Sequence, residues 1–427
     1  MKSKILILTP LIPYPLDEGG KISQYAFLEY LQYHMHISLI LVANNKQEEN
    51  YIDELKVKLP KVNIEYFKNF KEISKIEIPK KQITKKQKLK LIYYKIYDFI
   101  YPPKKVEKSV ITHAKENEKL TVPFNFNELN RNIINFITEK IDLIQPDLIQ
   151  IEHNSFLVYF YAIPQKYKTI FVEHEIQFER FAKHLEIYKS SYDKYVYNSS
   201  KDLEILLLNN ASMILTFSEE DKQKLIENKI TTLIESSAFP VLDSAFEKPE
   251  NFSAEKLVFI GAESHFPNKD ALDWYLTTIA EKIYHETNLK LHIIGKWSVE
   301  YKNKYSSEYI IFEGYVDDLK EICRNSIMIV PLRIGSGIRT KIMYGMTQGI
   351  PIVSTSIGCE GLGIIDNENI LVADDIDMFK NQIIKLYNDK LLCKKLSENA
   401  YNFIKNNFSQ EFLGNKRLEF YNKLLNN

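Results

Sequence analysis

The sequence lacks three features that would each assign it to a particular class of protein. Its 427 residues contain 56 Lys and Arg against 56 Asp and Glu, so nucleic acid is not expected as a partner. The three cysteines form no CxxC pair, which argues against a disulfide framework or a zinc site and favours a reducing, cytoplasmic location. No run of about 18 or more apolar residues occurs, so at most a peripheral membrane contact is expected.

The composition that remains is that of an ordinary globular protein. Hydrophobic residues make up 45% of the chain and charged residues 26%, and the length suits two or three domains. Pro10, Pro13 and Pro15 interrupt the chain soon after its first apolar run, before a signal-peptide core or a membrane span could form. We therefore expect Lys4–Thr9 to be a buried first strand.

Short apolar runs suited to buried parallel strands recur, with helical patterns between most of them. In the first half they are ILIL (5–8), HISLILVA (36–43), DLIQI (147–151), TIFVE (169–173) and SMILTF (212–217). In the second half they are KLVFIG (256–261), LKLHIIG (289–295), YIIFEG (309–314), SIMIVPL (326–332), IPIVST (350–355) and NILVA (369–373). This alternation predicts an α/β fold of two doubly wound, Rossmann-like domains, each with helices on both faces of a parallel sheet.

The polar stretch SSAFPVLDSAFEKPENFSAEK, which contains Pro240 and Pro249, separates the two series of strands and indicates a hinge. We predict an N-terminal domain over residues 1–238, a C-terminal domain over 250–405, and a helix over 406–427 that packs back toward the N-terminal domain. A cleft between the two domains is the expected ligand site.

A basic segment near residues 70–125 does not follow the alternation. Between Lys80 and Lys108 there are ten lysines against Asp98 and Glu107, and the stretch KLKLIYYKIYDFIY places Tyr and Ile among them. One interpretation is a solvated helix that packs its apolar side on the first domain. The alternative is a patch for an anionic membrane surface or a lipid-phosphate acceptor.

The most informative stretch is PLRIGSGIRTKIMYGMTQGIPIVSTSIGCEGL, at residues 331–362. A strand is expected to end at Pro331, a turn with Gly335, Ser336 and Gly337 to follow, and a helix to begin near Ile338. Such a turn directs backbone N–H groups and the positive end of a helix dipole at one place, which suits a phosphate.

Charged and polar side chains support that phosphate site. Arg333, Arg339 and Lys341 add positive charge, and helical spacing places Lys341 and Tyr344 on one stripe, where they can face the same ligand. The alternative is that these Arg and Lys residues are only surface charges.

Two common nucleotide motifs are missing. No GxGxxG follows the first strand, which weakens a dinucleotide site, and the absence of GxxxxGK[ST] excludes a P-loop NTPase. Gly19 and Gly20 lie between the first strand and its helix, where a ligand can approach a backbone without side chains, although a plain tight turn explains them too.

Four segments together resemble the group 1 family of retaining glycosyltransferases, over nearly the whole chain. They are TPLIPYPLDEGGKISQYAFLEYL, ASMILTFSEED, VFIGAESHFPNKDALDWYL and FEGYVDDLKEICRNSIMIVPLRIGSGIRTKIMYGMTQGIPIVST. The resemblance implies the GT-B architecture, in which two Rossmann-like domains face each other across a cleft. It also implies transfer of a sugar from a nucleotide-sugar donor to a glycan or lipid-linked acceptor, with retention of configuration, no cofactor and no required metal.

The same resemblance assigns residues to the site, with the donor mainly on the second domain and the acceptor on the first. The donor-binding residues expected in this way are Gly19, Gly20, Gly261, Tyr315, Val316, Arg333, Gly335, Ser336, Gly337 and Tyr344. The expected catalytic residues are Glu152, His174, Arg339 and Lys341. A nucleoside diphosphate is the leaving group, so positive groups placed where its charge grows are the expected source of rate enhancement.

The chain departs from the family pattern at two positions. Tyr344 stands where members usually have a Glu that accepts hydrogen bonds from the ribose, and Ser336 stands where many have a second Glu. A phenol can donate and accept, but it cannot supply two anionic oxygens. The leading hypothesis is an active glycosyltransferase of surface glycan synthesis. Two alternative hypotheses are a non-catalytic or partner-dependent relative and a nucleotide-sugar epimerase.

Two strand ends of the first domain carry candidate acceptor-side groups. DLIQIEHN places Glu152 at the carboxyl end of one strand, and TIFVEHEIQFERF places His174 at the end of another. The resemblance implies that both lie in the cleft. Asp317 and Asp318 could suggest a metal pair, but an Asp before LKEICRN is expected to cap the next helix instead.

Overall fold

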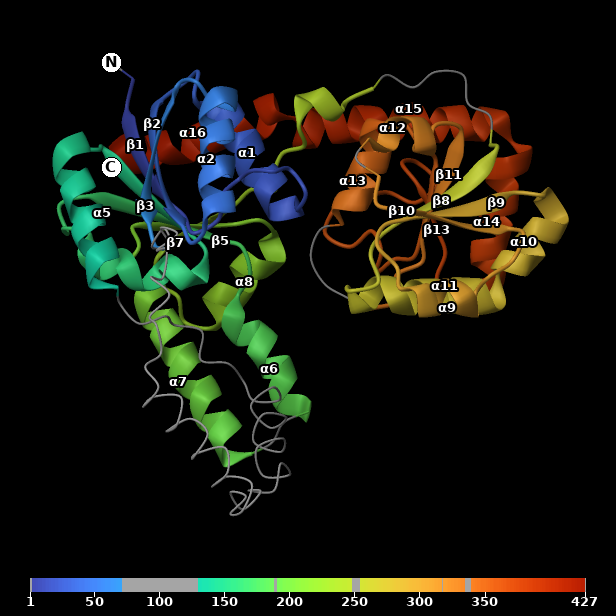
Figure 1. Cartoon of the computed structure of the whole chain (residues 1–427), viewed down its shortest axis with the longest axis horizontal. Coiled ribbons are helices and arrows are strands. Elements are labelled where there is room, and N and C mark those ends of the chain that lie inside the picture. The colour runs from blue at the N-terminus through green and yellow to red at the C-terminus, as the bar shows by residue number, and fades with distance from the viewer. Residues whose placement is uncertain are drawn as a thin grey trace, which may run out of the picture.

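The structure is a computed structural model that describes residues 2–70, 130–187, 190–247, 254–316, 318–334 and 339–426. It contains two parallel sheets with helices packed around them (Figure 1), which confirms the predicted fold class. The basic segment Lys80–Lys108, the turn Gly335–Gly337 and Asp317 lie outside the described residues. Among the described residues, no helix combines the length and apolar character that a membrane span needs.

The first sheet has seven strands in the order β3-β2-β1-β4-β5-β6-β7, and every neighbouring pair is parallel. The strands are β1 (Lys4–Leu8), β2 (His36–Ala43), β3 (Val62–Lys68), β4 (Leu148–Glu152), β5 (Lys168–Glu173), β6 (Met213–Thr216) and β7 (Leu233–Ser236). The central strands are almost wholly buried, as continuous apolar runs predict for a sheet covered on both faces.

Helices follow most strands of this sheet. They are α1 (Gly19–Leu31), α2 (Lys46–Lys58), α5 (Arg131–Ile144), α6 (Gln177–Ile187), α7 (Ser191–Leu208) and α8 (Glu219–Glu227), with a 3₁₀ segment over Asn154–Ala162. Side-chain caps begin several of them: the Asn45 side chain accepts from the N–H of Glu48, and the Ser218 hydroxyl accepts from that of Asp221. Helices α6 and α7 extend away from the sheet (Figure 1).

The second sheet has six parallel strands in the order β10-β9-β8-β11-β12-β13. They are β8 (Lys256–Ile260), β9 (Lys290–Ile294), β10 (Ile310–Gly314), β11 (Ser326–Val330), β12 (Ile352–Ser354) and β13 (Leu371–Val372). The helices are α9 (Phe266–Thr278), α10 (Ala280–Thr287), α11 (Val299–Lys304), α12 (Leu319–Cys323), α13 (Thr340–Thr347), α14 (Ile376–Asn388), α15 (Lys390–Phe408) and α16 (Gln410–Asn426). The side chain of Asp318 accepts from the N–H of Lys320 at 3.0 Å and so caps α12.

The last two helices join the two domains (Figure 1). Helix α15 packs against α13 of the second domain, and α16 packs against α1 of the first. At the break between them, the N–H of Val241 donates to the carbonyl of Phe408 at 2.8 Å. The amide of Gln410 donates to the carbonyl of Ala26 at 2.9 Å, and a Cβ on Gly414 would clash with the Tyr30 ring at 2.1 Å, so α16 lies directly on α1.

Candidate functional site

Strand order defines one crevice in each sheet. The order reverses between β1 and β4 in the first sheet and between β8 and β11 in the second, and ligands of doubly wound folds bind beyond the carboxyl ends of strands at such points. The loops there carry predicted site residues: Gly19 and Gly20 follow β1, Glu152 ends β4, and Gly261 follows β8. Arg339 lies between β11 and α13.

Two helix N-termini from different domains meet at the centre of the molecule. A Cβ added to Gly19, at the start of α1, would lie 3.0 Å from Cγ2 of Thr340, the first residue of α13. No side-chain hydrogen bond caps either helix at its N-cap residue, Glu18 or Arg339. Uncapped N–H groups and the positive ends of two helix dipoles thus lie near each other, an arrangement that favours an anion.

A cationic cluster surrounds the start of α13. Lys341 Nζ donates to Asn268 Oδ1 at 2.7 Å and lies 4.6 Å from the centre of the Phe259 ring. Burial, followed by the charge of Arg339, lowers the pKa of Lys341 to about 7. Burial also lowers the pKa of Arg339, while Glu360 opposes this shift.

His265 belongs to the same cluster. Desolvation and then the charges of Lys341 and Arg339 lower its pKa, although a hydrogen bond with Asn268 acts in the opposite direction. Burial therefore disfavours the charged form of all three basic groups, Arg339 adds to this effect on Lys341 and His265, and a bound anion would relieve the penalty. A cluster of this kind is suited to a diphosphate.

Not every residue predicted for the donor joins this cluster. Arg333 forms two hydrogen bonds to Asp270, at 3.1 Å from Nε and 2.5 Å from Nη2, and its guanidinium lies 5.8 Å from the Trp274 ring centre. Its charge is thus already paired with a carboxylate within the domain. Gly335, Ser336 and Gly337 lie outside the described residues.

Tyr344 lies on the predicted stripe with Lys341 but has different neighbours. Its hydroxyl is buried without a hydrogen-bond partner, and burial, followed by Cys323, Asp318 and Glu247, raises its pKa. An unpartnered buried hydroxyl is costly unless something absent from the free protein completes it. The position where the family pattern has a Glu thus holds a buried polar group that no described residue completes.

A hollow of about 500 Å³ lies next to Gly261, at the carboxyl ends of β8 and β9. Its lining residues are Glu263, Ser264, Lys269, Lys296, Trp297 and Ser298. Trp297 Nε1 donates to the carbonyl of Gly261 at 2.8 Å, and Lys296 Nζ lies 5.5 Å from the ring of Tyr315, which is 60% exposed. Val316, the next residue after Tyr315, is partly buried. The volume and the exposed ring suit one end of a nucleotide.

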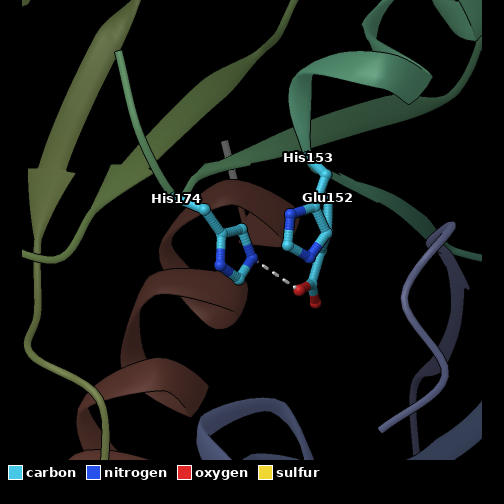
Figure 2. Close-up of side chains that lie close together, drawn as sticks. All are labelled: Glu152, His153 and His174. Carbon is cyan, nitrogen blue, oxygen red and sulfur yellow. Dashed lines mark hydrogen bonds and ion pairs between the residues drawn. The ribbon is translucent and has the colours of Figure 1, made fainter. Parts of the chain in front are cut away.

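The acceptor-side candidates lie together in the first domain (Figure 2). His174 Nε2 is 3.0 Å from Glu152 Oε2, and the ring of His153 stacks on that of His174, with centroids 3.8 Å apart and an interplanar angle of 14°. His153 has a φ of 66°, a left-handed conformation that turns its ring back toward His174.

Burial and charge set the protonation of this cluster. Burial alone would raise the pKa of Glu152, but the hydrogen bond and charge of His174, with the charges of His153 and Arg417, hold it below its usual range. Burial, followed by the charge of His174, lowers the pKa of His153 to about 4, so its imidazole is neutral near pH 7. An ionised carboxylate next to an imidazole can orient a hydroxyl or take up a proton.

The same three side chains are the group that could hold a metal ion among the described residues. One ligand atom from each of Glu152, His153 and His174 lies within 4.8 Å of the others. However, the carboxylate oxygen and the ring nitrogen nearest each other already bond to one another. A cation would have to break that bond, and the expectation of a metal-independent site stays a prediction.

Several site residues were missing from the sequence-based expectations. His265 and Asn268 lie in the segment VFIGAESHFPNKD, directly after β8, where their position in a switch-point loop could have marked them. His153 is the neighbour of Glu152. Trp297 follows β9, so the rule that strand ends gather ligands could have found it as well.

Comparisons with known proteins show what the chain and its fold are similar to. The model of the family described as "Glycosyl transferases group 1" matches residues 254–389. The chain is also 24% identical over 422 residues to an uncharacterised 44.6 kDa protein in the cps region of Klebsiella pneumoniae, an alignment that covers 96% of this chain and 97% of that protein.

Solved structures share the fold over the whole chain. HepE of Anabaena in complex with UDP has a TM-score of 0.63 at 12% identity, covering 98% of this chain and 100% of that one. TarM has a TM-score of 0.64 at 14% identity, covering 100% and 99%. Sucrose-phosphate synthase of Thermosynechococcus elongatus has a TM-score of 0.61 at 11% identity, covering 99% of each. The chain therefore has the GT-B fold of these structures, and residues 254–389 of its second domain match the group 1 glycosyltransferase family.

Proposed function

We propose that this protein transfers a sugar from a nucleotide-sugar donor to a glycan or lipid-linked acceptor, with retention of configuration. The observation that supports this most is the cationic cluster at the start of α13, where Arg339 and Lys341 flank Thr340, the residue that meets the N-terminus of α1. When the bond from the sugar to the phosphate breaks, negative charge grows on the departing diphosphate. Preorganised cations and helix N-termini stabilise that charge more in the transition state than in the ground state.

The first domain supplies the acceptor side of this proposal. The acceptor oxygen forms the new bond to the sugar and must give up its proton. Glu152, which is ionised, and His174, which is bonded to it, are the groups of the first-domain cluster that can orient that hydroxyl and take up the proton. They lie at the carboxyl ends of β4 and β5 in the first sheet, whereas Lys341 lies on α13, which follows β11 of the second sheet.

The nature of the donor and pathway follows from the relatives by analogy. HepE of Anabaena has been solved in complex with UDP and with UDP-glucose, which makes UDP-sugars the first donors to test. The similarity to a protein of a cps region favours surface polysaccharide synthesis as the process. Retention is proposed from the family resemblance.

A donor panel with two readouts tests the proposal. Nucleotide sugars are incubated with the purified protein and scored by thermal shift and by release of nucleoside diphosphate. A donor at 100 times its Kd should stabilise the protein by about 2.7 kcal/mol. Binding with diphosphate release supports a transferase, conversion of the donor sugar without release supports an epimerase, and binding without turnover supports a non-catalytic relative.

Metal independence has its own test. The reaction should proceed at the same rate in EDTA, because Lys341 and Arg339 supply the positive charge that a metal provides elsewhere. Loss of activity in EDTA that Zn²⁺ or Mn²⁺ restores would assign a metal to Glu152, His153 and His174 instead.

Contact with an anionic membrane through Lys80–Lys108 is part of the proposal, together with a cytoplasmic location at the membrane's inner face. Replacing Lys85, Lys86, Lys88 and Lys90 with Gln should release the protein from anionic liposomes, since each Lys near such a surface contributes about 1 kcal/mol. If the unmodified protein does not sediment with these liposomes at low salt, the membrane contact is wrong.

A further inference from the structure

A chain of buried polar groups connects the C-terminal helix to the acceptor-side cluster. The hydroxyl of Tyr421, on α16, donates to Gln150 Oε1 at 2.6 Å. The amide of Gln150 donates to Glu152 Oε1 at 2.6 Å, and the other carboxylate oxygen, Oε2, is the one that His174 contacts at 3.0 Å. The exposed fractions of Tyr421, Gln150 and Glu152 are 0%, 2% and 5%, so bulk solvent does not compete for these bonds.

Chemistry fixes the direction of this chain. An ionised carboxylate only accepts, so Gln150 must turn its NH₂ group toward Glu152. Its carbonyl oxygen is then left for Tyr421, which must donate. Each link therefore requires the next, and removing the Tyr421 hydroxyl leaves a buried carbonyl of Gln150 unpartnered and its amide free to rotate.

Arg417 lies one turn before Tyr421 on the same helix and adds charge to the chain. It is 2% exposed, its guanidinium lies 4.1 Å from the centre of the Phe27 ring, and it forms no ion pair with a carboxylate in the described part of the chain. Its charge acts on both the Tyr421 hydroxyl and Glu152. Arg417 and Glu152 line the same small cavity, so the buried guanidinium favours the ionised form of the carboxylate at the end of the chain.

The surrounding cavity is too small to be a ligand site. Gln150, Glu152, His174, Arg417 and Tyr421 all line a space of about 10 Å³. Such a volume holds about one water molecule. Ser23 and Gln24 of α1 also line it, and their side-chain polar atoms have no protein partner. This network therefore acts on the cluster at its end and does not bind a substrate of its own.

We propose that Tyr421 is a positioning residue, which acts through Gln150 to hold the carboxylate of Glu152 in the orientation that His174 requires. Figure 2 shows α16 passing beside Glu152 and His174. Because α16 continues from α15 of the second domain, the fit of this helix on α1 sets the geometry of the acceptor side. The expected effect of losing this chain on turnover rests on the proposed glycosyl transfer. The expected effect on the hydrogen bond of the His174 ring does not.

The test compares two variants. Each removes one tyrosine hydroxyl that hydrogen-bonds α16 to another element, either to strand β4 or to helix α1. Tyr421→Phe breaks the chain. Tyr30→Phe is the matched control, since the Tyr30 hydroxyl bonds to Asn415 Oδ1 of α16 at 2.8 Å but has no link to Glu152. With ¹⁵N-labelled histidine, the free wild-type protein should show the His174 proton on Nε2. Tyr421→Phe should shift or broaden those ring-nitrogen signals, and Tyr30→Phe should leave them unchanged.

Kinetics add a second readout once a donor is known. Tyr421→Phe should lower kcat about five- to tenfold and leave the KM for donor within about twofold, as expected for the loss of one buried hydrogen bond that acts on the reacting centre. In a Gln150→Met background the same substitution should have no further effect, because the intermediate link is gone.

The outcomes separate the two proposals. If Tyr421→Phe, folded by near-UV circular dichroism, matches Tyr30→Phe in its His174 signals, the positioning role is wrong, whatever the donor panel shows. Additive effects in the double variant would overturn it as well. Altered His174 signals in a protein that releases no nucleoside diphosphate would support the chain while rejecting the transferase.

Discussion

The two sides of the proposed site handle charge in opposite ways. In the first domain, Glu152 is ionised and bonded to His174, so the cluster carries its own counter-charges. In the second domain, burial disfavours the charges of Lys341 and Arg339, Arg339 further disfavours that of Lys341, and the Tyr344 hydroxyl has no partner. A cluster that is complete by itself is stable without a ligand, whereas a cluster of like charges gains stability from an anion. The comparison predicts that the second-domain cluster contributes mainly to donor affinity, whereas the first-domain cluster contributes mainly to the turnover rate.

The largest expected effect comes from breaking the acceptor side. Glu152→Gln and His174→Ala, made separately, should each lower turnover on the order of 100-fold, because proton transfer by a positioned group typically contributes that much or more. The Kd for donor should change less than threefold, since neither side chain belongs to the cationic cluster. Steady-state rates and equilibrium binding measure the two quantities.

Glu49→Gln serves as the control for general damage to the first domain. Glu49 is 7% exposed and bonds to Lys46 and Tyr66, so its loss should lower the melting temperature without changing turnover. If Glu152→Gln and His174→Ala keep wild-type turnover, neither residue is in the site. If they fail to fold while Glu49→Gln folds, the cluster is structural.

The second effect comes from removing a cation on the donor side. Lys341→Met should lower kcat/KM for the donor by about one to two orders of magnitude, because charge-assisted hydrogen bonds contribute about 1.5 to 3 kcal/mol. Its folding should be unharmed, since a lysine whose pKa is lowered to about 7 is costly to keep charged in the free protein. Lys304→Met, at an exposed lysine near Asp273, is the control and should bind donor normally.

A smaller effect should appear when pH replaces mutation. With its pKa lowered to about 7, Lys341 loses its proton as pH rises above neutrality, and a bound diphosphate raises that pKa again. Binding therefore takes up a proton, and nucleoside diphosphate affinity should fall by up to about tenfold per pH unit between pH 7 and pH 9. Calorimetry in two buffers of different ionisation enthalpy measures the uptake. The Lys341→Met variant should lose this slope, and an equal slope in the variant would assign it to another group.

Burial explains which strands the sequence could predict. HISLILVA was expected over 36–43 and forms β2 over His36–Ala43, because a strand buried on both faces is a continuous apolar run. The two strands that were missed, β3 (VNIEYFK) and β7 (LIES), lie at the two edges of the first sheet. An edge strand has one partner and a partly solvated surface, so its sequence mixes polar and apolar residues and resembles a loop.

Distance along the chain explains which parts of the site could not be predicted from the sequence. Strand-end rules and the family resemblance suggested Glu152 and His174, which the structure brings together. They could not suggest that Tyr421 reaches Gln150, 271 residues away, or that Asp270 neutralises Arg333 from 63 residues away. Such contacts depend on how helices pack over the finished sheets, and no local pattern encodes them.

The smallest expected effect tests whether the bound donor forms a hydrogen bond with the Tyr344 hydroxyl. Tyr344→Glu restores a carboxylate that can accept two hydrogen bonds from neighbouring ribose hydroxyls, but it adds a charge near Asp318 and Glu247. These effects oppose each other, so donor affinity should stay level or improve by no more than about threefold, roughly the value of one modest hydrogen bond.

Tyr344→Phe is the companion variant. It removes a hydroxyl that has no partner in the free protein, so the melting temperature should not fall, whereas donor affinity should drop a few-fold if the ribose completes that hydroxyl. Isothermal titration with the donor identified by the panel measures both. A large loss in Tyr344→Glu with no loss in Tyr344→Phe would mean that the donor passes this position in an apolar contact, and that the unpartnered hydroxyl is not a ligand for it.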